Sequence, residues 1–181
     1  FSKMIKESKT PVFLNSSDKS KNIKAPIEEI KSSAYALGAV GITPSLDGVY
    51  RKIDEKVNSN TTIPYEMAKR YTQNNHRPFL DYYKNDFQRI PYYNIIKAYR
   101  QYQDTKTLPK WTKSLANKIW IIGYSAPGLY DLRPSSISST STGMFILATA
   151  LSNRLQDHGK REISTLEISF ISLLLLIFIS L

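Results

Sequence analysis

Apolar positions along this chain recur mostly every three or four residues, which is the spacing of one face of an α-helix. Proline and acidic residues open several of these segments, and glycine closes them, as at helix ends. The pattern predicts helices over residues 25–38, 49–57, 60–73, 77–90, 92–103 and 107–123. We find no clean alternating strand of useful length. The sequence therefore predicts a mostly α, in fact all-α, protein built as a small helical domain.

The helical pattern is bounded on both sides by segments of different character. Residues 1–24 are polar, contain six lysines and lack periodicity, which indicates a flexible basic arm. Residues 124–142 are rich in Pro, Gly and Ser, which is typical of a linker. The expected organisation is an arm (1–24), a helical domain (25–123), a linker (124–142), and a helical hairpin or a helix plus hydrophobic tail (143–181).

The chain closes on an uncharged run, residues 168–181. Fourteen helical residues span about 21 Å at 1.5 Å per residue, whereas a bilayer core is about 30 Å thick. A tilted helix or a thinned bilayer could accommodate this difference. We therefore predict a short transmembrane helix that anchors the chain to a membrane. The residues predicted to make the attachment are Ile168, Phe170, Ile171, Leu173, Leu174, Leu175, Leu176, Ile177, Phe178 and Ile179.

Lys160 and Arg161 precede the run and are expected at the headgroups, where they would set its orientation. Two other interpretations of the tail stay open. It could be a lipid-anchor signal, although the small residues and the polar spacer are poorly defined. It could also be a buried helix that packs under the domain.

A second feature is a stretch in which aromatic and basic residues alternate, between residues 65 and 102. The simplest interpretation is that the aromatic residues are core and the basic residues are the solvated face. The same pattern also suits contact with RNA, an anionic lipid leaflet or a protein partner. The candidate contact residues are Lys69, Arg70, Arg77, Lys84, Arg89, Lys97, Arg100, Tyr82, Tyr83, Tyr92 and Tyr93. The net charge of +10 over 181 residues supports a polyanionic partner without naming one.

Little in the sequence indicates catalysis. The chain has no cysteine and two histidines, so thiolate metal sites, disulfides and a cysteine nucleophile are excluded. We predict that the protein is not an enzyme and that it has no cofactor, metal site or evident small-molecule substrate. Asn15 and Asn60 begin matches to the glycosylation sequon, which would matter only in the secretory pathway.

Together these features predict a non-enzymatic structural or accessory subunit of a membrane-associated assembly, attached through its C-terminal hydrophobic segment. Its expected partners are membrane lipid and other protein subunits, and its expected location is a membrane, with the mitochondrion as one candidate. One alternative is a basic RNA-binding protein of the organellar-ribosome type. A second alternative is a secreted precursor processed at basic pairs such as Lys160-Arg161.

Overall fold

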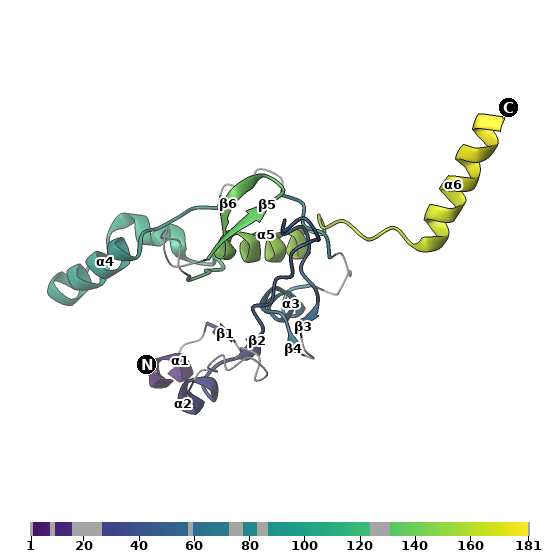
Figure 1. Cartoon of the computed structure of the whole chain (residues 1–181). Helices are drawn as coiled ribbons and strands as arrows, with labels where there is room; N and C mark the ends of the chain where they lie inside the picture. Colours follow the sequence, from purple (N-terminus) through teal and green to yellow (C-terminus); the bar gives the residue numbers. More distant parts are fainter. Residues whose placement is uncertain are drawn as a thin grey trace. The chain divides into compact units, whose positions relative to one another are not determined.

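A computed structural model describes residues 2–7, 10–15, 27–57, 60–72, 78–82, 87–123 and 131–180. Helices and short strands alternate along the chain (Figure 1). The prediction of a mostly α, all-α protein is wrong, because the fold mixes helices with three two-stranded sheets. In chain order the elements are α1 (Ser2–Glu7), β1 (Phe13–Asn15), α2 (Glu28–Lys31), β2 (Ala36–Gly38), β3 (Lys56–Val57), β4 (Asn60–Thr61), α3 (Ile63–Lys69), α4 (Tyr92–Thr105), the 3₁₀ helix η2 (Lys110–Leu115), β5 (Leu132–Ser135), β6 (Ser138–Thr142), α5 (Gly143–Gln156) and α6 (Thr165–Ser180).

The chain divides into two compact units, which we call unit 1 and unit 2. Unit 1 combines residues Phe1–Tyr82 with Tyr124–Leu181, and unit 2 is the segment Tyr83–Gly123 between them. The boundary differs from the expected one, in which residues 25–123 formed a single helical domain. Part of the expected flexible arm is also structured, because α1 and β1 lie within residues 1–24.

The predicted helix over residues 25–38 forms only its first turn. α2 ends at Lys31, and β2 then pairs in parallel with β1, in the register Phe13 with Ala36. The backbone N–H of Tyr35 donates to the Val12 carbonyl at 2.8 Å, which starts this pairing. At Gly38 the backbone approaches α3 so closely that a Cβ atom would lie 2.6 Å from Ile63 Cα. The pairing and this approach together favour extended structure over helix.

Residues 49–57 are extended rather than helical, although their apolar spacing predicted a helix. The backbone N–H of Tyr50 donates to the Pro134 carbonyl at 2.8 Å, and that of Ile53 donates to the Pro78 carbonyl at 3.0 Å. A helix was also predicted over residues 77–90. Of its first part the structure describes residues 78–82, which are not helical and which pair with residues 51–53 through backbone hydrogen bonds. Backbone hydrogen bonds to distant segments thus replace the local bonds of two short helices.

The core of unit 1 is built around three tyrosines that face small and branched apolar residues. Its buried members are Tyr50, Ile53, Tyr65, Tyr82, Ile146 and Ala150. The Tyr82 hydroxyl donates to the Tyr50 carbonyl at 2.8 Å, so its one donor is satisfied inside the core. Burial raises the pKa of the Tyr82 and Tyr65 phenols above the ordinary value, because the charged form would lose its hydration. Both phenols therefore remain neutral at physiological pH.

Most of the residues expected as a linker form a β-hairpin instead. β5 and β6 pair in antiparallel fashion over residues 132–142, whereas residues 124–130 lie outside the described ones. The hydroxyls of Ser135 and Ser141 bond each other at 2.7 Å inside this hairpin, where both side chains are buried. Here the serines pair across strands, so their abundance does not indicate an unstructured connection.

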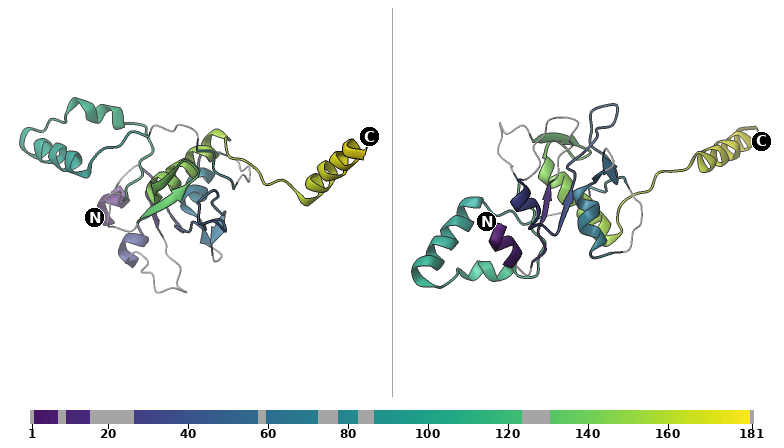
Figure 2. Two further views of the ribbon diagram at one scale, coloured as in Figure 1. Left: turned by 45° about the horizontal axis from the view of Figure 1, so that its top comes forward. Right: turned by 90° about the horizontal axis from the view of Figure 1, so that it is seen from below.

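α5 is the predicted helix after residue 142, and it packs against α3 and the hairpin (Figures 1 and 2). Thr142 caps the helix, since its hydroxyl accepts from the Phe145 N–H at 3.2 Å. Farther along α5, the buried Asn153 side chain reaches the residue 78–82 segment. Its Oδ1 accepts from the Asp81 N–H at 2.7 Å, and its Nδ2 donates to the Asp81 carbonyl at 3.1 Å. The Asn153 side-chain amide thus satisfies both the N–H and the carbonyl of Asp81, which lies outside any helix or strand.

Three other helix predictions have mixed outcomes. α3 and α4 are confirmed close to their predicted places, with Pro64 at the start of α3 as expected. The predicted helix over residues 107–123 shrinks to η2, because Ala116 is extended and Asn117 adopts a positive φ of 57°. In these three segments local apolar spacing locates the helix, but it overestimates the length of α3 and of η2.

Candidate functional site

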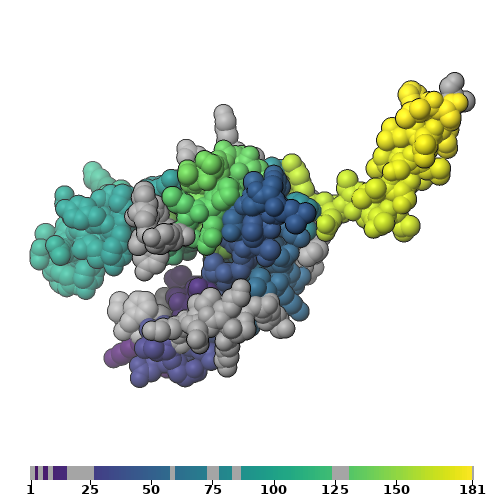
Figure 3. Space-filling view, in the orientation of Figure 1, coloured from purple at the N-terminus to yellow at the C-terminus, as the bar shows by residue number. Residues whose placement is uncertain are grey.

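α6 is the element that stands out chemically, because apolar side chains cover every face of it. Its large apolar residues are all exposed, with relative accessibilities from 49% to 82% (Figure 3). All ten residues predicted to attach the chain lie on this one helix. They are Ile168, Phe170, Ile171, Leu173, Leu174, Leu175, Leu176, Ile177, Phe178 and Ile179. Fully burying one such side chain contributes about 1.5–3 kcal/mol, so α6 has a strong tendency to leave water.

α6 does not meet the requirements of a transmembrane helix. Its 16 residues extend about 24 Å at 1.5 Å per residue, short of a bilayer core about 30 Å thick. Among the helices that the structure describes, none combines the length and the apolarity needed to cross a membrane. The prediction of a transmembrane helix is therefore wrong.

The first turn of α6 carries a reciprocal cap. The Ser164 carbonyl accepts the first helical bond from the Ile168 N–H at 3.0 Å. Glu167 Oε2 accepts from the Ser164 N–H at 2.9 Å and from its hydroxyl at 3.0 Å, while the Ser164 hydroxyl accepts from the Glu167 N–H at 3.3 Å. This is the capping box that a Ser followed three residues later by Glu indicates. This signal is visible in the sequence as Ser164 and Glu167 and is absent from the predictions above.

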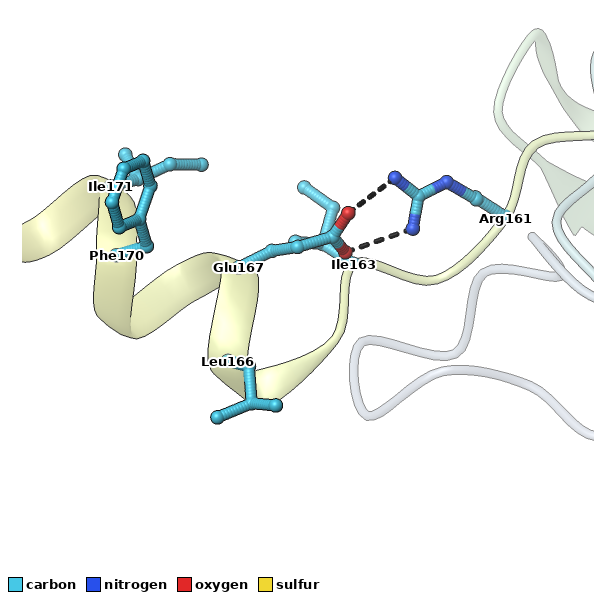
Figure 4. A pocket seen from close by; sticks show the side chains of 6 residues that line it. All are labelled: Arg161, Ile163, Leu166, Glu167, Phe170 and Ile171. Carbon is cyan, nitrogen blue, oxygen red and sulfur yellow. Dashed lines mark hydrogen bonds and ion pairs between the residues drawn. The ribbon is translucent and has the colours of Figure 1, made fainter.

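Arg161 closes the same turn from outside the helix (Figure 4). Its guanidinium donates two parallel hydrogen bonds to the Glu167 carboxylate, one of them 2.8 Å long from Nη1 to Oε2. The bonds from Arg161 and then those from Ser164 lower the pKa of Glu167 to about 2. The same pairing raises the pKa of Arg161. We call this ion pair the Arg161–Glu167 clasp.

The clasp forms one wall of an open groove of about 410 Å³. Apolar side chains line the remainder of the groove (Figure 4). The lining residues are Arg161, Ile163, Leu166, Glu167, Phe170 and Ile171. An apolar surface beside one satisfied ion pair suits contact with an acyl chain or an apolar side chain.

Both basic residues that precede α6 have partners. Lys160 joins an isolated bridge with Phe79, through backbone bonds of 3.0 and 3.1 Å, and its Nζ lies 3.8 Å from the Asp81 carboxylate. Arg161 forms the clasp. The pair expected to orient the tail thus ties the residue 78–82 segment of unit 1 to the first turn of α6.

The candidate contact residues of the aromatic and basic stretch fall into two groups. In unit 1, Lys69 pairs with Glu66 at 2.9 Å and the Arg70 guanidinium lies 4.6 Å from the Tyr35 ring centre. Tyr82 is a core residue, as described above, and so offers no contact surface.

Unit 2 holds five more exposed members of the stretch, in addition to Lys69 and Arg70 of unit 1. Arg89, Lys97, Arg100, Tyr92 and Tyr93 are all exposed there. Arg77, Tyr83 and Lys84 lie outside the described residues.

The remaining candidates concern modification and metal binding. Asn15 and Asn60 are exposed, at the end of β1 and in β4. Thr62, the third residue of the second sequon, is fully buried, and its hydroxyl donates to the Asp54 carbonyl at 3.0 Å. Nowhere in the described ranges do three or more His, Asp or Glu side chains gather so that they could hold a metal ion.

The fold and this site define a mixed α/β domain with an exposed apolar helix, α6. A short segment that contains Arg161 of the clasp connects this helix to the rest of the domain. The whole chain, residues 1–181, matches the profile of the CHASE2 domain, and the protein belongs to that family. CHASE2 domains are extracellular sensory domains, typically parts of membrane receptors, which bind small molecules and interact with other proteins. No curated protein matches the chain with significance. No solved structure does so either.

Family membership changes the functional interpretation of the sequence. A non-enzymatic accessory role and an association with a membrane agree with a sensory domain of this kind. The family gives no support to a mitochondrial location. The family gives no support to an RNA-binding protein or to a precursor cleaved at Lys160-Arg161.

Proposed function

We propose that this chain is the non-enzymatic sensory domain of a membrane receptor, and that α6 is the part of it that enters the lipid phase. The observation that carries the proposal is a CHASE2 match over the whole chain together with an apolar helix exposed on all sides. A helix that is apolar all round is found inside a protein or in lipid. The extracellular parts of membrane receptors lie close to lipid, which favours the second surrounding.

The connection between the core of unit 1 and α6 supports a role in transmission. Lys160 is fixed to Phe79 by two backbone hydrogen bonds, and Phe79 bridges in turn to Lys52. Arg161, the next residue along the chain, holds Glu167 in the first turn of α6. Only a few residues therefore separate a backbone ladder of unit 1 from a capped helix. Ligand binding that shifts the ladder would move the start of α6.

The role proposed here requires no chemistry from the protein. A sensory domain needs differential affinity of its ligand for two states, and it needs no nucleophile or metal. The groove beside the clasp is apolar, which suits lipid or an apolar partner surface better than a polar reactant.

Membrane partitioning tests the proposal. The double variant I171D/L175D places two carboxylates on α6, at exposed positions where they disturb no packing. We expect the full-length wild type to stay in the membrane pellet after carbonate extraction and the variant to be released. I27D/L46D is the matched control, because it places the same charges on exposed apolar positions outside α6. Release of the wild type, or equal release of both variants, would refute the role of α6.

The sensory role needs a separate measurement. A ligand that binds only the folded domain raises its thermal stability by mass action, so a small-molecule library can be screened by thermal shift. We expect at least one ligand class to raise the Tm of the wild type and of I171D/L175D equally, because both substitutions lie on α6 and leave the rest of unit 1 intact. A ligand that stabilises the wild type alone would place the sensed molecule on α6 and would contradict a sensor in the rest of unit 1.

A further inference from the structure

Unit 2 buries little of its apolar surface. Among its described residues, Ala98 is the only one with a buried side chain. On α4 an apolar stripe recurs at helical spacing and stays open, with relative accessibilities from 37% to 71%. Its exposed members are Tyr92, Ile95, Tyr99 and Tyr102. Three of the four are tyrosines, whose rings carry a polar hydroxyl at one end.

The two tryptophans of the protein, Trp111 and Trp120, also lie in unit 2. Both are exposed, and the Trp120 indole N–H already donates to the Leu115 carbonyl at 3.1 Å. Trp and Tyr are enriched where a membrane meets water, because each has an apolar body and a polar group. Unit 2 therefore presents the aromatic side chains that favour an interface.

The charge of the protein is concentrated in the same unit. Residues 83–123 hold eight Lys or Arg and two Asp, so a segment of 41 residues carries +6 of the total net charge of +10. The cations are Lys84, Arg89, Lys97, Arg100, Lys106, Lys110, Lys113 and Lys118. Lys110 and Lys113 are exposed and stand three residues apart on η2, which places them on one side of a 3₁₀ helix.

We propose that unit 2 docks on an anionic phospholipid surface, with its exposed tyrosines and tryptophans at the headgroups and its lysines and arginines against the lipid phosphates. Charge complementarity and the aromatic composition both point to this occupant. A nucleic acid would match the charge but not the extracellular setting of the family. The proposal goes beyond the attachment through α6 and does not depend on it, because it concerns a different unit of the chain.

Tryptophan emission is a selective probe, because both tryptophans lie in unit 2. We would add vesicles of phosphatidylcholine, alone or with about one third phosphatidylglycerol, to the full-length protein. Vesicles that contain phosphatidylglycerol should shift the emission to the blue, and brominated lipid should quench it. Half-molar salt should abolish both changes, because it reduces the screening length to a few ångströms.

Two variants test the charges. Each cation near an anionic surface contributes enough to raise affinity about fivefold, so K110Q/K113Q should weaken vesicle binding about 25-fold. K3Q/K6Q is the matched control: it removes the same charge from exposed positions of α1, in unit 1. Equal weakening by both pairs would overturn the proposal, because total charge rather than unit 2 would then drive binding.

The variant I171D/L175D separates this proposal from the attachment through α6. We expect its tryptophan shift with anionic vesicles to remain, whether or not α6 proves to bind lipid. The proposal fails if the wild type binds vesicles but its tryptophan emission stays unchanged, since α6 alone would then hold the protein on the vesicle. It also fails if single-stranded RNA at physiological salt binds more tightly than anionic vesicles and competes with them.

Discussion

Replacing Asn153 tests whether one buried amide holds the residue 78–82 segment in place. N153A removes the acceptor for the Asp81 N–H and the donor for its carbonyl, whose bonds are 2.7 and 3.1 Å long. An unsatisfied backbone group costs about 1–3 kcal/mol. Asp81 is half-buried, so the lower part of that range applies to both groups. Two such groups cost about 2–3 kcal/mol, of which alanine offsets about 0.5 kcal/mol through its helix propensity. The expected loss is therefore about 1.5–2.5 kcal/mol.

Urea unfolding followed by circular dichroism measures this loss. With a slope of about 2 kcal/mol per molar urea, the midpoint of N153A should fall by about 0.7–1.3 M. N94A is the control, because Asn94 is an exposed asparagine on α4 and should change stability by less than about 0.5 kcal/mol. If N153A changes stability as little as the control does, the two hydrogen bonds do not hold the segment and the reasoning is refuted.

N153D makes the test specific for hydrogen bonding. The carboxylate can still accept from the Asp81 N–H but cannot donate to its carbonyl, and burial raises its folded-state pKa above the unfolded value of about 3.9. Protonation restores a donor. The destabilisation relative to wild type should therefore be small below about pH 4 and should grow as the pH rises. A pH-independent difference would indicate that shape rather than hydrogen bonding matters at this position.

Three further predictions concern other parts of the molecule. G38A would place a Cβ atom 2.6 Å from the backbone of Ile63, so we expect it to lose about 1–3 kcal/mol and to lower the Tm; an unchanged Tm would show that the two segments can separate freely. The Glu167 carboxyl should titrate near pH 2 in carbon-detected NMR. Because this folded-state pKa is depressed, the clasp should be complete above about pH 4.5 and lost as the pH falls through 2, and R161Q should move the midpoint back up. An unmoved midpoint in R161Q would show that Arg161 does not hold the carboxylate. Y82F removes one buried hydrogen bond and should cost about 1 kcal/mol in thermal unfolding; a stabilised variant would mean that the phenol is strained.

The helices that could be predicted from the sequence are those with local signals. α5 begins after a threonine cap and α3 contains a proline in its first turn, and both effects act within a few residues. The same reasoning fails at residues 49–57. There the partners of Tyr50 and Ile53 are Pro134 and Pro78, which are far away in sequence. Apolar spacing in a short segment cannot distinguish a helix from an extended segment that pairs with such distant partners.

The candidate site was predictable in composition but not in geometry. The apolar run identified α6, because no arrangement of those residues gives the helix a polar face. The capping box was also visible, as Ser164 and Glu167 three residues apart. The clasp was not, because Arg161 lies outside the helix and no short-range rule pairs it with Glu167. The hairpin was missed for a chemical reason, since serine hydroxyls that pair inside a sheet resemble a linker in composition.

Unit 2 is inserted between the two parts of unit 1. This position affects when unit 1 can fold during synthesis and how freely the length of the insertion can vary. Tyr50 bonds Pro134, and Phe79 bonds Lys160, so the halves of unit 1 on either side of the insertion complete each other. Such pairings form slowly, since the intervening chain must first be closed into a loop. A growing polypeptide cannot form the Phe79–Lys160 pairing of unit 1 until about residue 160 has been made. The apolar helix α6 is synthesised immediately afterwards. Loop closure depends only weakly on length, about 0.6 kcal/mol for each doubling. The insertion could thus grow or shrink considerably while the domain around it remained the same.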